Sequence, residues 1–214
     1  MSAFEPSPRS LGSAASRSLV AEAALAPKPG LVDPRRPGPH ADMDFELLVA
    51  SARALEPCFV GCAAEGRAAA QDGARPGGML PTLRAIGLKG EEAMFRTTRG
   101  VNTHKGSVFA LGLLVAASSY DLARGGGARG TRPPFGDRAC ARAAEILRGL
   151  GPELVIGNGR ERSHGERLFD EYGIRGARGQ AEDGFPVLRG SVLPVLRAAA
   201  SAGKAMEVAS VDAL

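Results

Sequence analysis

The 214-residue sequence lacks several features that mark secreted and membrane proteins. Its three cysteines, Cys58, Cys62 and Cys140, form neither an even disulfide set nor a paired C-x-x-C metal motif. We expect them to be small buried thiols of a reduced compartment, and therefore a cytoplasmic protein. The first 30 residues contain no secretory hydrophobic region, and the longest apolar run, 107–119, is too short to span a bilayer.

Lysine is also scarce, since only four of the 27 basic residues are lysines. With 23 acidic residues the net charge is +4, and the two signs are interspersed along the chain. No nucleic-acid-binding or membrane-binding face is therefore predicted. A glycine- and arginine-rich run at 124–132 leaves RNA binding as an alternative, but Phe135 is the only aromatic residue close enough to stack on bases.

The common nucleotide-binding and hydrolase motifs are missing as well. Residues 100–107 place Lys105 before Gly106, which reverses the Gly-Lys-Ser/Thr order of a P-loop, and no strand is evident before them. The sequence has no G-x-G-x-x-G after a strand and no G-x-S-x-G elbow. If the protein binds ATP, it must hold the nucleotide in another way.

The sequence does contain a series of helical patterns. Apolar residues recur at helical spacing, and proline or glycine separates the segments. We predict an all-α protein, a single mostly helical domain over 10–214 around a central buried helix, with a disordered N-terminus at 1–9 and a flexible loop at 124–137. The expected helices cover 10–26, 42–70 with an interruption at Pro57, 76–85, 89–97, 138–150 and 191–201.

The stretch 100–117 predicts the central helix. A polar turn containing Asn102, Thr103, His104 and Lys105 leads into a segment that is apolar on every face, which is typical of a core helix. Unpaired N–H groups and the positive dipole end of a helix gather at its N-terminus, so this turn suits a phosphate or carboxylate. The alternative is a capped buried helix whose Lys105 reaches solvent.

Carboxylates mark the start of the helix expected at 42–70. Asp42 precedes Phe45 by three residues and Asp44 precedes Leu48 by four, so on a helix both would border the core-facing stripe. Alternatively, Asp42 is an N-cap and Asp44 a first-turn acid favoured by the helix dipole. With Glu92, these carboxylates suit a hard cation such as Mg²⁺ accompanying a polyphosphate.

All three histidines, His40, His104 and His164, fall at polar turns beside predicted helix starts, which favours a shared site. A three-histidine metal site is less favoured, because no short His-to-His ligand spacing exists. Near His164, glycines alternate with Arg175 and Arg178, as in a loop that grips phosphates. A solvated arginine loop is the alternative for that segment.

Five polar motifs, taken together and in order, carry a family resemblance. The sequence resembles the triphosphoribosyl-dephospho-coenzyme A synthases, which serve citrate lyase and malonate decarboxylase, and the likeness extends from about Ser18 to Leu196. The motifs are PKPGLVD (27–33), HADMD (40–44), EAM (92–94), GVNTHKG (100–106) and YGIRGARG (172–179).

The resemblance implies a helical fold and a pentosyl transfer. The 2′-hydroxyl of 3′-dephospho-CoA attacks the anomeric carbon of the ATP ribose, adenine leaves, and the product is the precursor of an acyl carrier protein prosthetic group. As expected partners we therefore name ATP, 3′-dephospho-CoA, Mg²⁺ and the transferase that loads the carrier protein.

For this chemistry we assign hypothetical roles to individual residues. Phosphate or nucleotide binding is expected of Lys28, Asn102, Thr103, Lys105, Gly106, Arg175 and Arg178. Mg²⁺ binding is expected of Asp42, Asp44 and Glu92. For catalysis we expect His40 or His104 to move the proton, and Asp44 to stabilise the positive charge that develops on the ribose.

In one respect the sequence departs from the family pattern. The family continues through more helices to a glycine- and serine-containing motif, whereas this sequence stops at Leu214. The resemblance therefore predicts a shortened member. Its alternative function is that of a catalytically inactive remnant that binds a nucleotide or coenzyme A.

Overall fold

The computed structural model describes residues 6–125, 133–148, 171–173, 176–205 and 208–210. Across these ranges the regular structure is helical, and the only β-type pairing is an isolated bridge between Asp33 and Arg36. The predicted all-α class is confirmed. The elements are α1 (Pro8–Ala24), α2 (Phe45–Ala54), α3 (Glu56–Gln71), the 3-10 turn η1 (Pro76–Met79), α4 (Leu80–Thr97), α5 (Lys105–Ala123), α6 (Phe135–Leu147), α8 (Gly176–Glu182), the π turn η3 (Leu188–Val192) and α9 (Leu193–Ser201).

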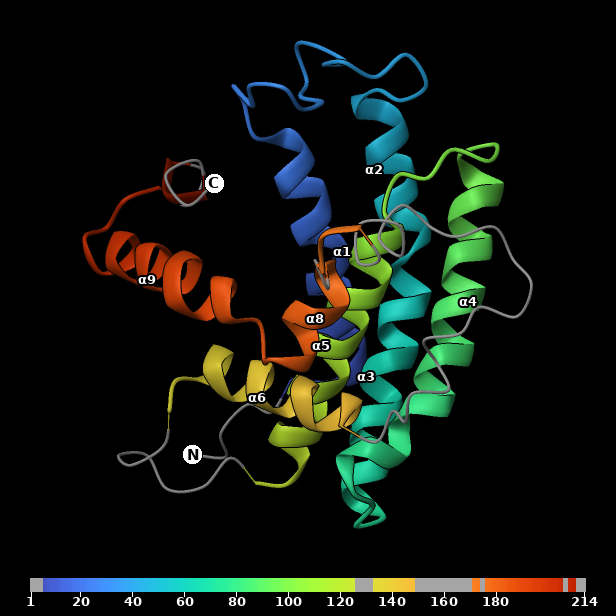
Figure 1. The fold of residues 1–214 in the computed structure, drawn as a ribbon, viewed down its shortest axis with the longest axis vertical. Helices are drawn as coiled ribbons and strands as arrows, with labels where there is room; N and C mark the ends of the chain where they lie inside the picture. The colour runs from blue at the N-terminus through green and yellow to red at the C-terminus, as the bar shows by residue number, and fades with distance from the viewer. Residues whose placement is uncertain (1–5, 126–132, 149–170, 174–175, 206–207, 211–214) are drawn as a thin grey trace.

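The first five helices form an antiparallel bundle (Figure 1). α1 rises, α2 and α3 descend as one nearly continuous column, α4 rises, and α5 descends through the middle of the molecule. This order brings the connection 25–44 and the connection 98–104 toward the same end of the bundle, the upper end in Figure 1. Sequence motifs that lie about 60 residues apart in the chain therefore become neighbours.

α5 is the buried central helix that the sequence predicts. It packs against α1, α3, α4, α6 and α8, and buried residues lie on all of its sides from Val108 to Asp121. Its closest neighbour is α3, where a Cβ on Gly66 would lie 2.1 Å from the Ala116 carbonyl oxygen. Only glycine permits this approach of the two backbones, and the core that results encloses Phe59 and Leu55 completely.

Local sequence signals explain most helix ends. The column of α2 and α3 is interrupted at Leu55, just before Pro57, as predicted. α1 begins at Pro8 with the Ser7 hydroxyl accepting from the Ser10 N–H, so the predicted disorder at 1–9 is wrong for Pro8 and Arg9. Residues 1–5 lie outside the described part of the chain.

α4 differs from its prediction, because one helix replaces the two expected over 76–97. η1 leads directly into a continuous α4, and the glycines inside it do not end it. At Gly90 an added Cβ would lie 2.5 Å from the Cys58 sulfur. Packing against α3 thus uses this glycine as a contact point within the helix. The break expected at 86–88 falls around Gly87, and α4 passes through it without interruption.

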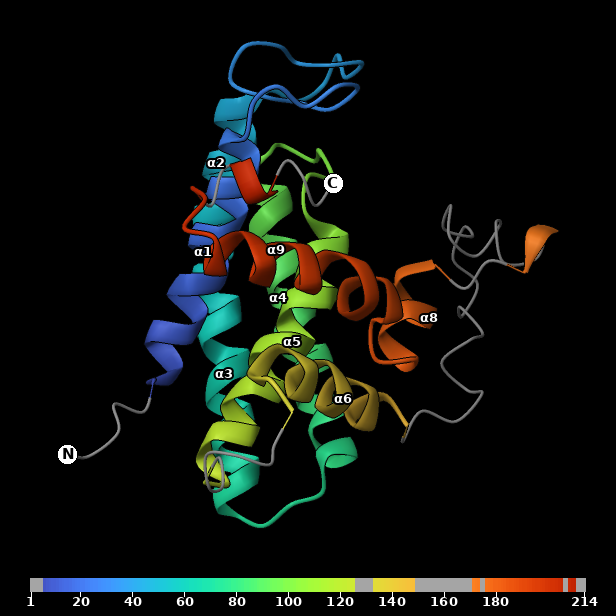
Figure 2. The ribbon, with the colours of Figure 1, turned by 90° about the vertical axis from the view of Figure 1, so that its left-hand side faces the viewer.

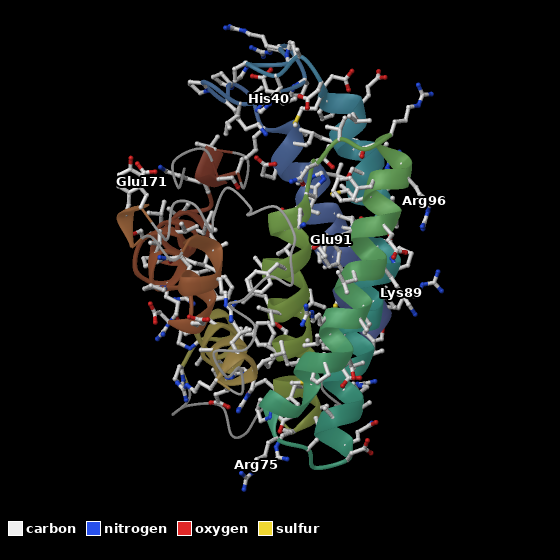
Figure 3. The ribbon with its side chains drawn as sticks, turned by 45° about the vertical axis from the view of Figure 1, so that its right-hand side comes forward. His40, Arg75, Lys89, Glu91, Arg96 and Glu171 are labelled. Carbon is white, nitrogen blue, oxygen red and sulfur yellow. The ribbon has the colours of Figure 1, made fainter. Side chains whose placement is uncertain are left out.

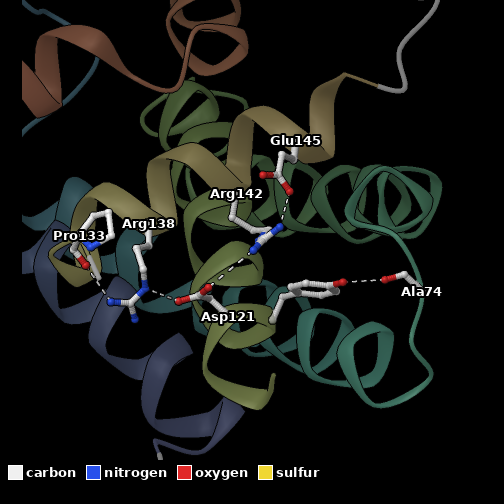
Figure 4. Close-up of polar contacts among 7 residues, drawn as sticks. Ala74, Asp121, Pro133, Arg138, Arg142 and Glu145 are labelled. Carbon is white, nitrogen blue, oxygen red and sulfur yellow. Dashed lines mark hydrogen bonds and ion pairs between the residues drawn. The ribbon is translucent and has the colours of Figure 1, made fainter. Parts of the chain in front are cut away.

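α6 is fastened to the end of α5 by an acidic residue. Asp121 accepts from Arg138 Nε at 2.7 Å and lies 3.7 Å from Arg142 Nη2, while the neighbouring Tyr120 hydroxyl donates to the Ala74 carbonyl at 2.7 Å (Figure 4). Since α6 starts at Phe135, the loop predicted for 124–137 ends earlier than expected. Residues 126–132 of that loop lie outside the description.

The C-terminal elements lie across the bundle. α6 and α9 run transverse to α3 and α5 in both views of the ribbon (Figure 2). Asp137 at the start of α6 accepts from Arg197 of α9 at 2.8 Å and lies 3.6 Å from Arg189 of η3. As predicted, Pro194 occupies the first turn of α9, where the missing N–H costs no helical hydrogen bond.

The structure tests the expectations about the cysteines and about the apolar segments. All three cysteines are free and buried, as predicted. By length and composition, 45–71 and 105–123 would each suffice to cross a membrane, contrary to the expectation that the second is too short. The 105–123 segment is 56% buried within the molecule, as expected of the core helix that it forms.

Candidate functional site

An open hollow of about 990 Å³ lies where the connection 25–44 enters α2. His40, Asp42 and Asp44 line it, together with Glu46 from the first turn of α2 and Arg99 from the turn after α4. In Figure 3 His40 marks this end of the molecule, and Arg75 marks the opposite end. The hollow therefore combines carboxylates, an imidazole and a guanidinium from two separate connections.

The carboxylates of the hollow do not border a helical stripe. α2 begins only at Phe45, so Asp42 precedes the helix and its side chain is 63% exposed. Asp44 is the N-cap, and its Oδ1 accepts from the Leu47 N–H at 2.8 Å. The helical-spacing interpretation is thus wrong, and the capping role falls to Asp44 instead of Asp42. His40 Nδ1 lies 3.9 Å from Asp42 Oδ1.

Arg99 reaches the hollow from a tight turn that ends α4. Its φ is +54° and that of Gly100 is +93°, and the Gly100 N–H donates to the Phe95 carbonyl at 2.9 Å. These left-handed residues close the helix in the manner of a Schellman motif. The Thr98 hydroxyl lies 2.9 Å from the Met94 carbonyl and 2.6 Å from the Val101 carbonyl, so its one hydrogen is shared between them and holds the turn in place.

The N-terminus of α5 lies at the turn for which the sequence predicts anion binding. Asn102 Oδ1 accepts from the Lys105 N–H at 3.2 Å, and the Val108 N–H donates to the His104 carbonyl. Within the part of the chain that the structure describes, the N–H groups of Gly106 and Ser107 make no hydrogen bond. Gly106 is exposed, with open space where a Cβ would be.

Lys105 is paired across to the neighbouring helix. Its Nζ lies 3.2 Å from Oε2 of Glu91 on α4, with 39% of the lysine side chain and 24% of the glutamate side chain exposed. Glu91 thus faces α5, whereas the next residue, Glu92, lies on the exposed face of α4, 3.9 Å from Arg96. Figure 3 shows Glu91 toward the bundle and Arg96 at its outer edge.

His104 lies inside the bundle instead of in the hollow. It is 6% exposed, and its backbone N–H donates to the Met94 sulfur. Nδ1 of its ring lies 2.9 Å from Ser51 Oγ of α2. Ser51 Oγ in turn lies 2.6 Å from the Thr103 hydroxyl. Burial lowers the pKa of His104 below its usual value, and the negative charge of Glu22 only partly opposes this shift. The ring is accordingly neutral at pH 7.

Lys28 is also buried, and it has a partner. Only 2% of its side chain is exposed, and its ammonium donates to both the backbone carbonyl and the carboxylate of Glu22, each at 2.9 Å. It thereby caps the end of α1. Asp33 fixes the same connection, because N–H groups of Arg35, Lys28 and Arg36 hydrogen-bond to its carboxylate and lower its pKa.

The remaining predicted site residues fall apart from the hollow or outside the description. Arg178 of α8 pairs with Glu182 one turn later at 3.0 Å. His164 and Arg175 lie among the residues that the structure does not describe. In the described ranges no group of three or more His, Cys, Asp or Glu side chains gathers to hold a metal, so the expected trio of Asp42, Asp44 and Glu92 does not assemble.

Comparison with known proteins adds a second line of evidence to this geometry. The family model described as ATP:dephospho-CoA triphosphoribosyl transferase matches residues 8–214. The chain belongs to this family. Proteins named as probable 2-(5''-triphosphoribosyl)-3'-dephosphocoenzyme-A synthases are similar to it: one from Lactiplantibacillus plantarum is 40% identical over 85% of the chain, and one from Pseudomonas aeruginosa is 41% identical over 92%.

The chain spans 62% of the length of these transferase relatives. A third, from Pseudomonas syringae, is 40% identical over 92% of the chain and has the same coverage of its own length. No solved structure matches the chain. Family membership agrees with the resemblance carried by the five motifs, three of which, at 27–33, 40–44 and 100–106, meet at one end of the bundle.

The fold of this transferase-family chain adds residues that the sequence did not single out. Ser51 lies on the buried stripe of α2 between Leu48 and Leu55, and a serine inside an apolar stripe was its available signal. Glu91 lies three residues before the fully buried Met94, which places it beside the core. Arg99 had no such signal, because its place depends on the turn that ends α4.

Proposed function

We propose that this protein carries out the pentosyl transfer described by its family name. The 2′-oxygen of 3′-dephospho-CoA forms a bond to C1′ of the ATP ribose, while the bond from C1′ to N9 of adenine breaks. Adenine leaves with the bonding electrons. In the net reaction it takes up the proton that the 2′-hydroxyl loses. The triphosphate stays on the product. The observation that carries the proposal is the meeting of motifs 27–33, 40–44 and 100–106 at one end of a bundle of this family.

In this proposal the N-terminus of α5 holds the triphosphate. The free N–H groups of Gly106 and Ser107, the dipole of α5 and the ammonium of Lys105 all favour an anion. Asn102 and Thr103 shape the turn, and Arg175 and Arg178 are proposed to close on the phosphates. Lys28 is proposed to act indirectly, since its contacts with Glu22 fix the connection that carries His40.

Magnesium fits the hollow only in part. Asp42 and Asp44 both line it, and Mg²⁺ commonly binds through one or two carboxylates and substrate phosphates. Glu92 does not fit, because it lies on the exposed face beside Arg96. Bound with ATP, the ion would supply charge neutralisation for the phosphates.

The side chains around the two connections suit the chemistry of an oxocarbenium-like transition state. Asp44 is proposed to stabilise the positive charge that develops on the ribose. His40 lines the hollow and can donate a hydrogen bond to the departing adenine, while His104, held neutral by burial, can accept the hydroxyl proton.

We further propose that the product is the precursor of the prosthetic group of an acyl carrier protein belonging to citrate lyase or malonate decarboxylase. A cytoplasmic location is proposed with it. Three buried free thiols support a reducing compartment.

The test is to incubate the purified chain with ATP, Mg²⁺ and 3′-dephospho-CoA and to follow adenine and the triphosphoribosyl adduct by mass spectrometry. We expect both products to appear together and in equal amounts. Omitting 3′-dephospho-CoA should abolish adenine release. Binding of ATP without either product would overturn the proposed catalysis and would favour the inactive nucleotide-binding remnant.

A further inference from the structure

Ser51 is a buried hydroxyl whose hydrogen bonds lead to the ring of His104. The residue is 0% exposed, on the inner face of α2, and its Oγ lies 2.9 Å from His104 Nδ1 and 2.6 Å from Thr103 Oγ1. Three groups from α2 and from the turn before α5 thus form one chain of hydrogen bonds. In the described part of the chain, Nε2 of the same ring has no hydrogen-bond partner.

We propose that Ser51 is a positioning residue that holds His104 with its hydrogen on Nδ1, so that Nε2 is free to accept the hydroxyl proton of the substrate. This inference rests on the proposed pentosyl transfer, which needs such a base. The Nδ1–H donates to Ser51 Oγ, and the Ser51 hydroxyl donates to Thr103 Oγ1. Thr103 is partly exposed, so its own hydrogen can be given to water or substrate.

This direction of the hydrogen bonds prepares the site for proton transfer. When Nε2 accepts a proton, both ring nitrogens become donors, and Ser51 must then accept from Nδ1. With Nδ1–H already donating to Ser51, no hydrogen bond has to reverse during the reaction. In the opposite direction, with Ser51 donating to Nδ1, Nε2 would carry the hydrogen and could not act as a base.

The surrounding charges agree with a base that is neutral before the reaction. The carboxylate of Glu22 on α1 opposes the lowering of the ring's pKa, and Lys28 holds that carboxylate at 2.9 Å. Lys105 follows His104 in the chain, but its ammonium pairs with Glu91 of α4. The negative charge of Glu22 favours the imidazolium that forms once the proton has moved.

A structural role for Ser51 predicts different consequences, and the chain offers a matched control. Ser16 is 2% exposed, and its hydroxyl donates to the Ala52 carbonyl of α2 at 2.9 Å. Ser16→Ala and Ser51→Ala each remove one buried hydroxyl beside the same helix. Only Ser51→Ala removes a partner of His104.

The first experiment measures the tautomer directly. The chain has three histidines, so ¹⁵N-histidine labelling gives few signals, and His104→Gln identifies the one from this ring. We expect the hydrogen on Nδ1 in the wild-type protein and in Ser16→Ala, and a shift toward Nε2 in Ser51→Ala. Hydrogen on Nε2 in the wild type, or an unchanged tautomer in Ser51→Ala, would overturn the proposal.

The second experiment separates this proposal from the proposed function. If the wild type releases no adenine, the pentosyl transfer fails and the role of His104 as its base fails with it, while the NMR result still decides the tautomer. If the wild type is active, Ser51→Ala should lower kcat about tenfold or more and change the KM for ATP by less than about twofold. Equal kcat values for Ser51→Ala and Ser16→Ala would refute the positioning role.

Thr103 provides an independent variant should Ser51→Ala fold poorly. Thr103→Val removes the group that accepts from Ser51 at a partly exposed position. We expect Thr103→Val to lower kcat and Thr103→Ser, which keeps the hydroxyl, to restore it. Full activity in Thr103→Val would show that the hydrogen-bond chain is not needed.

Discussion

Glu91 Oε2 of α4 lies 3.2 Å from Nζ of Lys105, the first residue of α5. The lysine that the sequence assigns to phosphate binding is thus paired with a carboxylate from another helix. Because both side chains are partly exposed, the pair is weak and an incoming phosphate can take the place of the carboxylate. Two predictions depend on this exchange.

Lys105→Ala should raise the KM for ATP about 10- to 100-fold, because a charge-assisted hydrogen bond to phosphate contributes about 1.5–3 kcal/mol. The free energy of unfolding should change by less than about 1 kcal/mol, since the pair with Glu91 is partly exposed. Steady-state kinetics and urea unfolding measure the two effects. Lys89→Ala, on the exposed surface of α4, is the control, and an unchanged KM in Lys105→Ala would remove the phosphate role.

Glu91→Gln should act in the opposite direction on the same lysine. Without the competing carboxylate the ammonium of Lys105 is free to meet phosphate, so the KM for ATP should fall, by up to about fivefold. The Glu92→Gln variant, which alters the neighbouring carboxylate on the exposed face, should leave it unchanged. A higher KM in Glu91→Gln would show instead that Glu91 supports substrate binding.

Lys28→Met should destabilise the fold, because Lys28 joins α1 to the connection that follows it. The substitution keeps the length of the side chain but removes the donor to the Glu22 carbonyl and carboxylate in a buried place. We expect the free energy of unfolding to fall by about 1–3 kcal/mol. Urea denaturation tests this, with the exposed Lys89→Met for comparison, and equal stability of the two variants would argue against a buried capping role.

The stability of the protein should fall as the pH drops below 6.5, the usual pKa of histidine. Burial holds the pKa of His104 below that value in the folded state, so between the two pKa values the unfolded chain binds a proton that the folded chain does not. The contribution of His104 to the free energy of unfolding is complete above pH 6.5. It declines as the pH falls, by at most about 1.4 kcal/mol per pH unit.

The measurement is urea unfolding from about pH 7.5 to 5.5. His104→Asn should flatten the pH dependence, whereas His40→Asn should keep it, because the side chain of His40 is 41% exposed. Identical slopes in His104→Asn and the wild type would mean that His104 is not held neutral by its surroundings.

Helix patterns and motif order were sufficient to predict much of this architecture. The apolar stretch 107–119 could only form a buried helix, and α5 is that helix. Pro57 and Pro194 lie in the first turns of α3 and α9, where a missing N–H is tolerated. The break predicted at 86–88 is wrong, because α4 runs through Gly87 without interruption. Gly90, inside the second predicted helix, is a packing position against Cys58.

The candidate site was harder to predict, since side-chain direction depends on where each helix begins. A start of α2 at Phe45 instead of Asp42 turns two expected helical carboxylates into a loop residue and an N-cap. All three histidines lie at polar turns of the sequence, but His40 is in the hollow, His104 is inside the bundle, and His164 lies outside the described residues.

The sequence by itself determined the helical class, the central helix and the set of polar motifs, because these depend on residues close together in the chain. Only the tertiary structure decided the partners: Glu91 for Lys105, Glu22 for Lys28, and Ser51 for His104. These pairs join residues on different helices, or a helix residue and a residue of a connection. Their contacts follow from how the bundle packs, which the spacing of residues along one chain does not specify.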